Sequence, residues 1–289
     1  MKVGIIGFGF VGNALSKGMK KSVDIIKIDP KLGTDINDLI TFEPDFVFIS
    51  VPTPMNDDGA QDLSILNSVF NQIKDSQLNT TLILKSTVTP ENLHHLEKKL
   101  EFVYNPEFLR EKSALDDFIN GEIIIFGGDK ELCGEVSNFY KEFTLCKKKE
   151  HFITDKTTAS LIKYAINSFL ATKVIYFNQL ESVFRLSNSN MDWSAFIKII
   201  AEDKRIGNSH MDVPGHDGRK GFGGACFPKD ISALERYASK AGFNFSLVQE
   251  VIKINNQIRS VYNDPIEREI DQNISFNEDQ FNMPGWWNW

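Results

Sequence analysis

The sequence predicts a Rossmann-type α/β fold, a doubly wound parallel sheet, followed by an all-helical domain built on one long helix. Short apolar runs alternate with helical patterns through about the first 150 residues, which is typical of parallel sheets covered by helices. A stretch without Gly or Pro then extends from about residue 157 to 186. The chain of 289 residues is long enough for two domains of ordinary size.

The first domain is expected to comprise residues 1–150. A helix is expected from Asn13 to Lys21, and helical patterns separate most of the later strands. Residues 147–149, a basic run, mark the expected end of the domain. Strands are predicted where apolar and β-branched residues form short runs, at residues 2–6, 23–28, 45–51, 80–85, 101–104 and 122–126.

The second domain is expected to comprise residues 151–262. Its long helix, at 157–186, would be about 45 Å long at 1.5 Å per residue, and apolar residues recur along it at helical spacing. Shorter helices are expected at 192–202, 229–241 and 245–261. Residues 263–289 form a tail whose last four residues hold Trp286, Trp287 and Trp289, which either dock on a surface or belong to a disordered terminus.

Composition excludes several classes of protein. Apolar residues make up 42% and charged residues 25%, so disorder is not the main state. The net charge of −7 provides no global basic field for nucleic acid. No apolar run is long enough for a membrane helix, and the N-terminus lacks a signal-peptide pattern. Three cysteines form neither a disulfide framework nor a metal-ligand spacing. We therefore expect a cytoplasmic protein without a metal, nucleic-acid or membrane partner.

A dinucleotide site is indicated by the motif GFGFVG at residues 7–12, which follows a strand and opens a helix. Gly7 permits the tight turn, Gly9 lets a pyrophosphate approach, and Gly12 allows helix and strand to pack closely. Asp29 lies at the end of the next strand, where a carboxylate accepts from ribose hydroxyls and repels a 2′-phosphate. The pattern favours NAD over NADP, and its context disfavours the alternative of a merely tight turn.

Two later strand ends carry polar loops, Val51-Pro52-Thr53-Pro54 and Ser86-Thr87-Val88. Open α/β sheets bind ligands at the carboxyl ends of their strands, so both loops are expected to face the cofactor. Ordinary turn chemistry remains the alternative for either loop alone.

A nucleophile is indicated by GFGGACFPKD at residues 221–230. Cys226 lies between a glycine loop and a helix, and the helix N-terminus together with Lys229 would favour the thiolate. Inert core packing is the interpretation kept for Cys133 and Cys146.

The sequence at this point resembles the UDP-glucose/GDP-mannose dehydrogenase family, and the UDP-glucose 6-dehydrogenases within it. The matching segments occur in the family's order and extend to about Arg259. They are GFGFVG (7–12), Asp29, VPTP (51–54), STV (86–88), NPEFLRE (105–111), KYAIN (163–167), RIGN (205–208) and GFGGACFPKD (221–230).

The resemblance implies an NAD-dependent oxidation of a sugar nucleotide's primary alcohol to a carboxylate, with UDP-glucose to UDP-glucuronate as the expected reaction. Two hydride transfers would proceed through a thiohemiacetal and a thioester on Cys226. Lys163 and Asn167, spaced i, i+4, would stabilise a developing oxyanion, and Asp230 would position water. The implied catalytic residues are Cys226, Lys163, Asn167, Asp230, Thr87 and Glu107.

The resemblance also implies two sets of binding residues. The NAD-binding set is Gly7, Gly9, Phe10, Val11, Gly12, Asp29, Val51, Pro52, Thr53, Ser86, Thr87 and Glu111. The substrate-binding set is Glu107, Phe108, Leu109, Arg110, Glu111, Lys163, Asn167, Arg205, Gly221, Phe222, Gly223 and Gly224.

Arg205 is implied to reach a neighbouring subunit's site, so a homodimer formed through the helical domain is expected. A local ion pair with Asp203 is the alternative for this arginine. Glu107 and Glu111 could likewise be ordinary capping or salt-bridge carboxylates.

The sequence departs from the family where relatives continue into a C-terminal UDP-binding domain, because only about 28 residues follow Val261. Arg219 and Lys220 are the candidates to supply missing phosphate contacts. Two other functions stay open: a two-electron β-hydroxyacid dehydrogenase, which needs no cysteine, and a non-catalytic protein that binds NAD or a sugar nucleotide.

Overall fold

The computed structural model describes residues 1–276, which divide into two compact units. The first unit comprises residues 1–53 and 62–163, and the second comprises residues 54–61 and the chain from Tyr164 onward. The division falls inside one long helix, α7 (Lys156–Leu186). The domain boundaries expected at residues 150 and 262 stay predictions.

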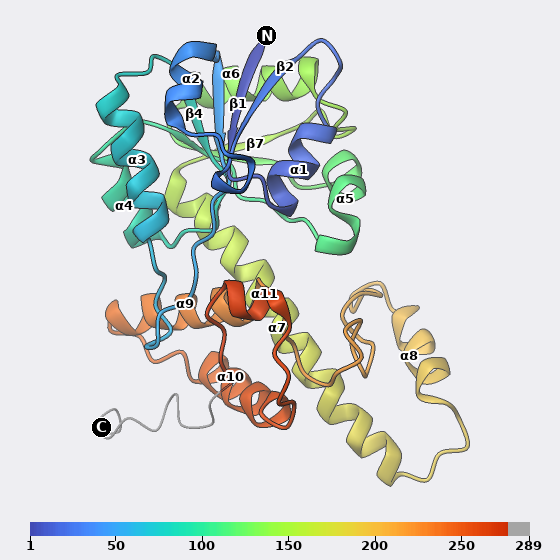
Figure 1. The fold of residues 1–289 in the computed structure, drawn as a ribbon. Coiled ribbons are helices and arrows are strands. Elements are labelled where there is room, and N and C mark those ends of the chain that lie inside the picture. The colour runs from blue at the N-terminus through green and yellow to red at the C-terminus, as the bar shows by residue number, and fades with distance from the viewer. Residues whose placement is uncertain (277–289) are drawn as a thin grey trace. The chain divides into compact units, whose positions relative to one another are not determined.

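The first unit is built on a sheet of seven strands in the order β2-β1-β3-β4-β5-β6-β7 (Figure 1). Six of these strands lie close to the predicted runs. The bounds of all seven strands are β1 (Lys2–Ile6), β2 (Asp24–Ile28), β3 (Phe46–Ile49), β4 (Thr81–Leu84), β5 (Val103–Tyr104), β6 (Ile125–Gly127) and β7 (Phe152–Thr154).

The expectation of a wholly parallel sheet was wrong at one pair of strands, β5 and β6. Strands β2 through β5 pair in parallel, but β5 pairs with β6 in antiparallel fashion, Tyr104 opposite Gly127. Strand β7, which was not predicted, pairs in parallel with β6. An antiparallel connection begins and ends at the same edge of a sheet. The connection from β5 to β6, residues 105–124, therefore begins and ends at the carboxyl end of β5.

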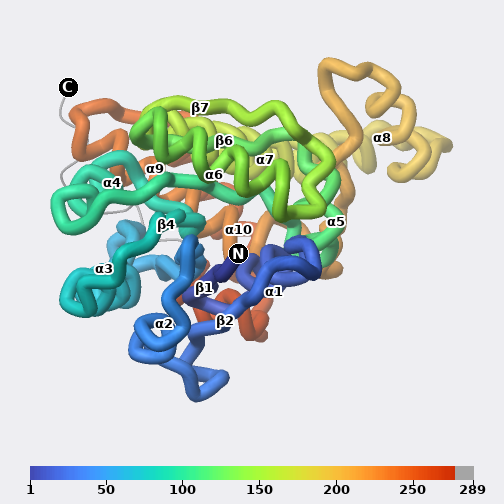
Figure 2. Tube along the Cα trace, turned by 90° about the horizontal axis from the view of Figure 1, so that it is seen from above, coloured from blue at the N-terminus to red at the C-terminus, as the bar shows by residue number. Residues whose placement is uncertain are grey.

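Helices cover both faces of this sheet (Figures 1 and 2), which confirms the doubly wound class. Neighbouring strand residues alternate between two cores: Val47 and Ile49 belong to one, Phe48 to the other. Helices α2 (Ile36–Phe42), α3 (Ser64–Ser76) and α4 (Pro90–Glu97) pack on the first face. The other face is covered by α1 (Phe10–Lys17), α5 (Ala114–Asn120) and α6 (Lys130–Phe143).

Helix α1 begins at Phe10, three residues before the predicted start, because the glycine motif opens directly into it. Two short 3₁₀ helices follow strand ends, η1 (Pro30–Leu32) and η2 (Glu111–Ser113).

The second unit is assembled from helices, as predicted. Helix α7 has 31 residues and begins one residue before the predicted range. The others are α8 (Trp193–Ala201), α9 (Phe227–Lys240), α10 (Ser246–Arg259) and the short α11 (Glu267–Asp271). Helix α11 was not predicted. A core of Ala171, Ile175, Phe222, Ile231 and Val251 joins α7, α9 and α10.

Among residues 1–276, no helix is both long enough and apolar enough to span a membrane. The tryptophan-rich end of the tail lies in residues 277–289, outside the described residues.

Candidate active site

The three motif glycines of the first unit meet different requirements. Gly7 has φ +85°, and a Cβ there would lie 2.7 Å from the carbonyl oxygen of Ser50. A Cβ on Gly12 would overlap the carbonyl oxygen of Gly7, whereas nothing lies within 4 Å of the corresponding position at Gly9. Packing therefore requires glycine at 7 and 12. At Gly9, the N-cap of α1, the absent side chain leaves the open space that a pyrophosphate at a helix N-terminus needs.

Asp29 is fixed beside this loop. One carboxylate oxygen accepts from the backbone N–H of Phe8 at 2.7 Å, and the other accepts from Lys31 N–H at 2.9 Å. A carboxylate oxygen has capacity for a further hydrogen bond, so Asp29 remains able to accept from a ribose. Together with the open space at Gly9, this geometry fits a dinucleotide; Phe10 and Val11 form the first turn of α1.

The two polar loops at the strand ends are tied to each other. Ser86 Oγ donates to the carbonyl oxygen of Val51 at 2.6 Å, and Thr53 Oγ1 donates to that of Thr87 at 3.1 Å. Pro52, between Val51 and Thr53 in the first loop, is exposed. The first loop follows β3, which borders the β1/β3 switch point where ligands of such sheets bind, and the second follows the next strand, β4.

Glu107 and Lys163 form a buried ion pair within the first unit. Glu107 Oε1 lies 3.5 Å from Lys163 Nζ, and both side chains are almost fully buried. Glu107 Oε2 accepts from the backbone N–H of Leu109 at 2.6 Å, and Lys163 Nζ lies 5.3 Å from the centre of the Phe108 ring. The pair thus joins the loop after β5 to α7 and holds a carboxylate and an ammonium group together away from solvent.

Two neighbours of Glu107 in the sequence lie nearer the surface. Arg110 is exposed and forms an ion pair with Asp117 at 2.6 Å. Glu111 is also exposed, at the first position of η2.

Lys85 was missed by sequence reasoning, although a lysine ending an apolar strand is a usable signal. Its Nζ donates to Asn105 Oδ1 at 2.8 Å, and the Tyr140 hydroxyl donates to the same oxygen at 2.6 Å. Asn105 Nδ2 donates to the carbonyl of Ile125 at 2.9 Å. This buried network fixes Asn105, two residues before Glu107.

Burial lowers the pKa of Lys85 from 10.5 to about 8, although the nearby Glu107 opposes that shift. Between these two pH values the unfolded chain binds more protons at Lys85 than the folded protein does. The free energy of unfolding should therefore rise with pH across this window, relative to a Lys85→Met variant, by up to about 3 kcal/mol. Denaturant titrations of both proteins at several pH values measure the difference. A difference that is flat from pH 8 to 10.5 would contradict the buried-lysine account.

In the second unit, Cys226 is the N-cap residue of α9, so its thiol lies at the start of a 14-residue helix. Gly221 and Gly224, with φ +72° and +79°, lie in the left-handed region. A Cβ on Gly221 would lie 2.7 Å from Asn255 Oδ1, and one on Gly223 would overlap Arg259 and Glu269. At Gly224, by contrast with Gly221 and Gly223, a Cβ would meet nothing within 4 Å. Most of this loop's glycines are therefore required by the chain's own side chains.

Asp230 is 1% exposed and is held from two sides. Asn167 Nδ2 donates to Asp230 Oδ2 at 2.7 Å, and Lys229 Nζ donates to Oδ1 at 2.5 Å. Lys229 is therefore paired with Asp230, one helical turn after Cys226. Asn167 lies four residues after Lys163 on α7, which places both on one side of that helix.

Three basic residues are engaged in ion pairs. Arg205 is exposed and pairs with Asp203 at 2.6 Å, and this bond raises the pKa of Arg205. Arg219 pairs with Asp264 at 2.8 Å and Lys220 with Glu181 at 2.9 Å. The local pair that sequence analysis gave as the alternative for Arg205 is thus present.

The fold and the glycine–aspartate site together define a dinucleotide-binding protein of the Rossmann class that carries a cysteine at a helix N-terminus in its helical unit. Matches to two family models show which family of this class the chain belongs to. Residues 31–144 match the NAD binding domain, and residues 157–257 match the central domain, of the UDP-glucose/GDP-mannose dehydrogenase family. The chain belongs to this family. The match confirms the predicted family and the predicted cofactor, NAD.

Curated relatives carry consistent names. The chain is 34% identical over 237 residues to a UDP-glucose 6-dehydrogenase of Rickettsia bellii, a match that covers 79% of this chain and 53% of that protein. It is 32% identical over 226 residues to a UDP-glucose 6-dehydrogenase of Bacillus subtilis, covering 74% and 49%. The chain thus spans about half the length of the curated relatives it matches.

Solved structures agree on the fold. A UDP-glucose dehydrogenase from Pyrobaculum islandicum superposes with a TM-score of 0.69 at 25% identity, over 89% of this chain and 68% of that one. The 3-hydroxyisobutyrate dehydrogenase of Mycobacterium tuberculosis superposes with a TM-score of 0.65 over 98% and 99% of the two chains, at 14% identity. The second likeness shows the fold alone.

Proposed function

We propose that the protein is a cytoplasmic, NAD-dependent sugar-nucleotide 6-dehydrogenase that oxidises a primary alcohol to a carboxylate. UDP-glucose is the proposed substrate. The observation that carries the proposal is Cys226 at the N-terminus of α9, one turn before the buried Asp230–Asn167 pair, in a chain with the family's NAD binding domain.

Bound NAD supplies a hydride acceptor. The chain's contribution to cofactor binding is the space at Gly9, the carboxylate of Asp29 and the linked loops at Val51–Thr53 and Ser86–Thr87. Glu111 is proposed to contact the nicotinamide ribose.

In the first oxidation, the alcohol loses a proton and a hydride and becomes an aldehyde. Glu107, with Thr87 holding a water, assists removal of the proton, and the Lys163 ammonium and the Asn167 amide stabilise the developing oxyanion. Glu107 and Lys163 are already paired, which keeps both charged groups in place with little solvent between them.

The Cys226 thiolate then attacks the aldehyde carbon, and the resulting alkoxide takes a proton to give a thiohemiacetal. Loss of a second hydride and of the hydroxyl proton leaves a thioester. Water oriented by Asp230 attacks the thioester carbonyl, the C–S bond breaks, and the carboxylate leaves a restored thiol. The covalent adduct prevents escape of the aldehyde.

The sugar nucleotide is proposed to lie along Phe108, Leu109, Arg110 and Glu111 and the loop from Gly221 to Gly224. Arg205 is proposed to reach a second subunit, which its exposed guanidinium permits.

A homodimer through the helical unit is part of the proposal. Phe169, Tyr176 and Val183 are exposed by about 60% or more and lie seven residues apart on α7, so they form one apolar stripe along the helix. Sedimentation equilibrium tests this assembly: a mass near twice 32.8 kDa is expected, and a monomeric mass would contradict it.

The test of the function is the stoichiometry of NADH formation with UDP-glucose, UDP-N-acetylmannosamine and GDP-mannose. Two NADH per carboxylate formed are expected from one of these substrates. One NADH per product, obtained with a small hydroxy acid, would indicate the two-electron alternative. No NADH from any sugar nucleotide, together with NAD binding by calorimetry, would leave the non-catalytic binding protein.

A further inference from the structure

We propose that Glu269, on the short helix α11, is a positioning residue for the cysteine loop. Through the peptide of Gly224 and the guanidinium of Arg259, it determines the conformation of residues 221–224 and so the position of Cys226. The inference rests on the proposed function, because it assigns Glu269 an effect on the reaction of that cysteine.

The loop before Cys226 is held residue by residue by buried side chains from three helices. Gly221 N–H donates to Asn178 Oδ1 of α7 at 2.9 Å. Asn255 of α10 accepts from Phe222 N–H at 2.7 Å and donates to its carbonyl at 3.0 Å. Gly224 N–H donates to Glu269 Oε1 of α11 at 3.1 Å. Glu269 is thus the last of these contacts before the cysteine.

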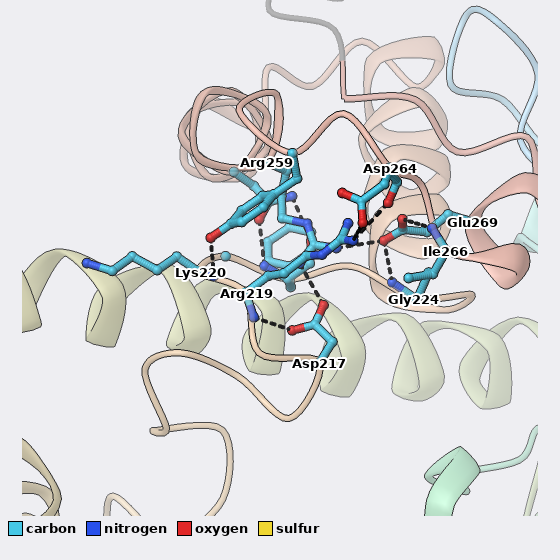
Figure 3. Close-up of polar contacts among 12 residues, drawn as sticks. Asp217, Arg219, Lys220, Gly224, Arg259, Asp264, Ile266 and Glu269 are labelled. Carbon is cyan, nitrogen blue, oxygen red and sulfur yellow. Dashed lines mark hydrogen bonds and ion pairs between the residues drawn. The ribbon is translucent and has the colours of Figure 1, made fainter.

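The Glu269 carboxylate makes two further hydrogen bonds (Figure 3). Oε1 also accepts from Arg259 Nη2 at 2.8 Å, and Oε2 accepts from the backbone N–H of Ile266 at 3.1 Å. Arg259 Nη1 donates in turn to Asp217 Oδ2 at 2.7 Å. The side chains of Glu269 and Arg259 are 1% and 0% exposed. Loss of Arg259 would remove this counter-ion from a buried carboxylate, and loss of Glu269 would leave the buried guanidinium with Asp217 as its remaining partner in this group, so both side chains are strongly constrained to this geometry.

Gly223 shows that the loop lies directly on this ion pair. A Cβ built on Gly223 would overlap both Arg259 Nη2 and Glu269 Oε1. The backbone of the loop and the two charged groups therefore define each other's positions. A change in the carboxylate is therefore expected to shift the loop backbone that lies against it.

Gly224 is two residues before Cys226 and has φ +79°. Glycine adopts positive and negative φ values about equally readily, so its own backbone does not select this conformation. Its hydrogen bond to Glu269 selects one orientation of the peptide that leads into the N-cap of α9. A displacement of about 1 Å at a reacting atom can cost on the order of a hundredfold in rate. Glu269 lies beyond residue 257, the end of the match to the central-domain model.

The test compares Glu269→Gln with Glu267→Gln, a change of the same kind at an exposed position of the same helix. We expect kcat to fall about ten- to a hundredfold in Glu269→Gln, with the KM for NAD unchanged. Alkylation of Cys226 by iodoacetamide, followed by mass spectrometry of its peptide, should change in rate and in pH profile. Glu267→Gln should match wild type in every measurement.

Glu269→Asp adds a graded comparison, since it retains the charge and shortens its reach. Its alkylation profile should lie between those of wild type and Glu269→Gln, and it replaces the Gln variant if that variant does not fold. If the Glu269→Gln variant folds and keeps wild-type kcat and wild-type alkylation of Cys226, the inference is overturned. If that variant does not fold, a Glu269→Asp variant with a wild-type alkylation profile overturns it instead. Alkylation needs neither NAD nor substrate, so this arm still tests Glu269 if wild type oxidises no sugar nucleotide.

Discussion

Replacement of Cys226 by serine should reduce the steady-state formation of carboxylate by at least about a thousandfold, equivalent to about 4 kcal/mol in activation free energy. Serine preserves the size of the side chain and the N-cap position on α9. Its hydroxyl ionises far less readily than a thiol, so the adduct that the second oxidation requires forms too slowly. The measurement is NADH release under saturating UDP-glucose, with carboxylate quantified separately.

Cys133→Ser is the matched control, because the same atom is exchanged in a cysteine outside the proposed site. Cys133 is fully buried on α6, and burial raises the pKa of its thiol to about 11. It is therefore protonated at neutral pH and cannot act as a nucleophile there. The control should keep wild-type activity at temperatures where it is folded. Wild-type carboxylate yield from the Cys226→Ser variant would remove the nucleophile from the proposal, whatever the control does.

Alanine at two glycines of the same motif should have opposite consequences. Gly12→Ala introduces a Cβ that overlaps the backbone oxygen of Gly7, and neither the helix nor the strand can retreat cheaply. We expect a loss of several kcal/mol in the free energy of unfolding, on the order of 3 kcal/mol, well above the ~1 kcal/mol that alanine gains in a helix. Gly9→Ala meets no atom within 4 Å, so it should cost at most about 1 kcal/mol, the penalty of alanine at an N-cap.

NAD affinity should distinguish the two variants in the opposite sense, with the larger loss in Gly9→Ala. A methyl group at residue 9 would occupy the space proposed for the pyrophosphate, and we expect about a tenfold or greater loss in affinity, or at least ~1.4 kcal/mol. Denaturant titration and calorimetric titration with NAD measure both quantities on both variants. Unchanged NAD affinity in Gly9→Ala would place the cofactor elsewhere, and unchanged stability in Gly12→Ala would contradict the packing described for α1.

The elements that the sequence predicted are those whose signals are local. The motif at residues 7–12 determines a strand, a tight turn and a helix within a few residues of one another, and the gap-free helical pattern predicted α7 to within one residue of its start. Asp29 was placed correctly at the end of β2, because the spacing within a βαβ unit is nearly constant. Cys226 was placed correctly at a helix N-terminus by the glycines before it and the helical pattern after it.

Tertiary structure decided which distant residues meet. The antiparallel entry of β6, the Lys85–Asn105–Tyr140 network, the Asn167–Asp230 bond and the contact of Glu269 with Gly224 join positions that are 20 to 63 residues apart. The local sequence gives no signal that distinguishes Glu269 from Glu267, since both lie in the first turn of α11. Glu269 has a different role because the fold buries it against Arg259. Periodicity and spacing report the conformation of a segment, because they arise from its own backbone geometry. The partner of a buried charge depends on how the segments pack, and that information exists only in the folded chain.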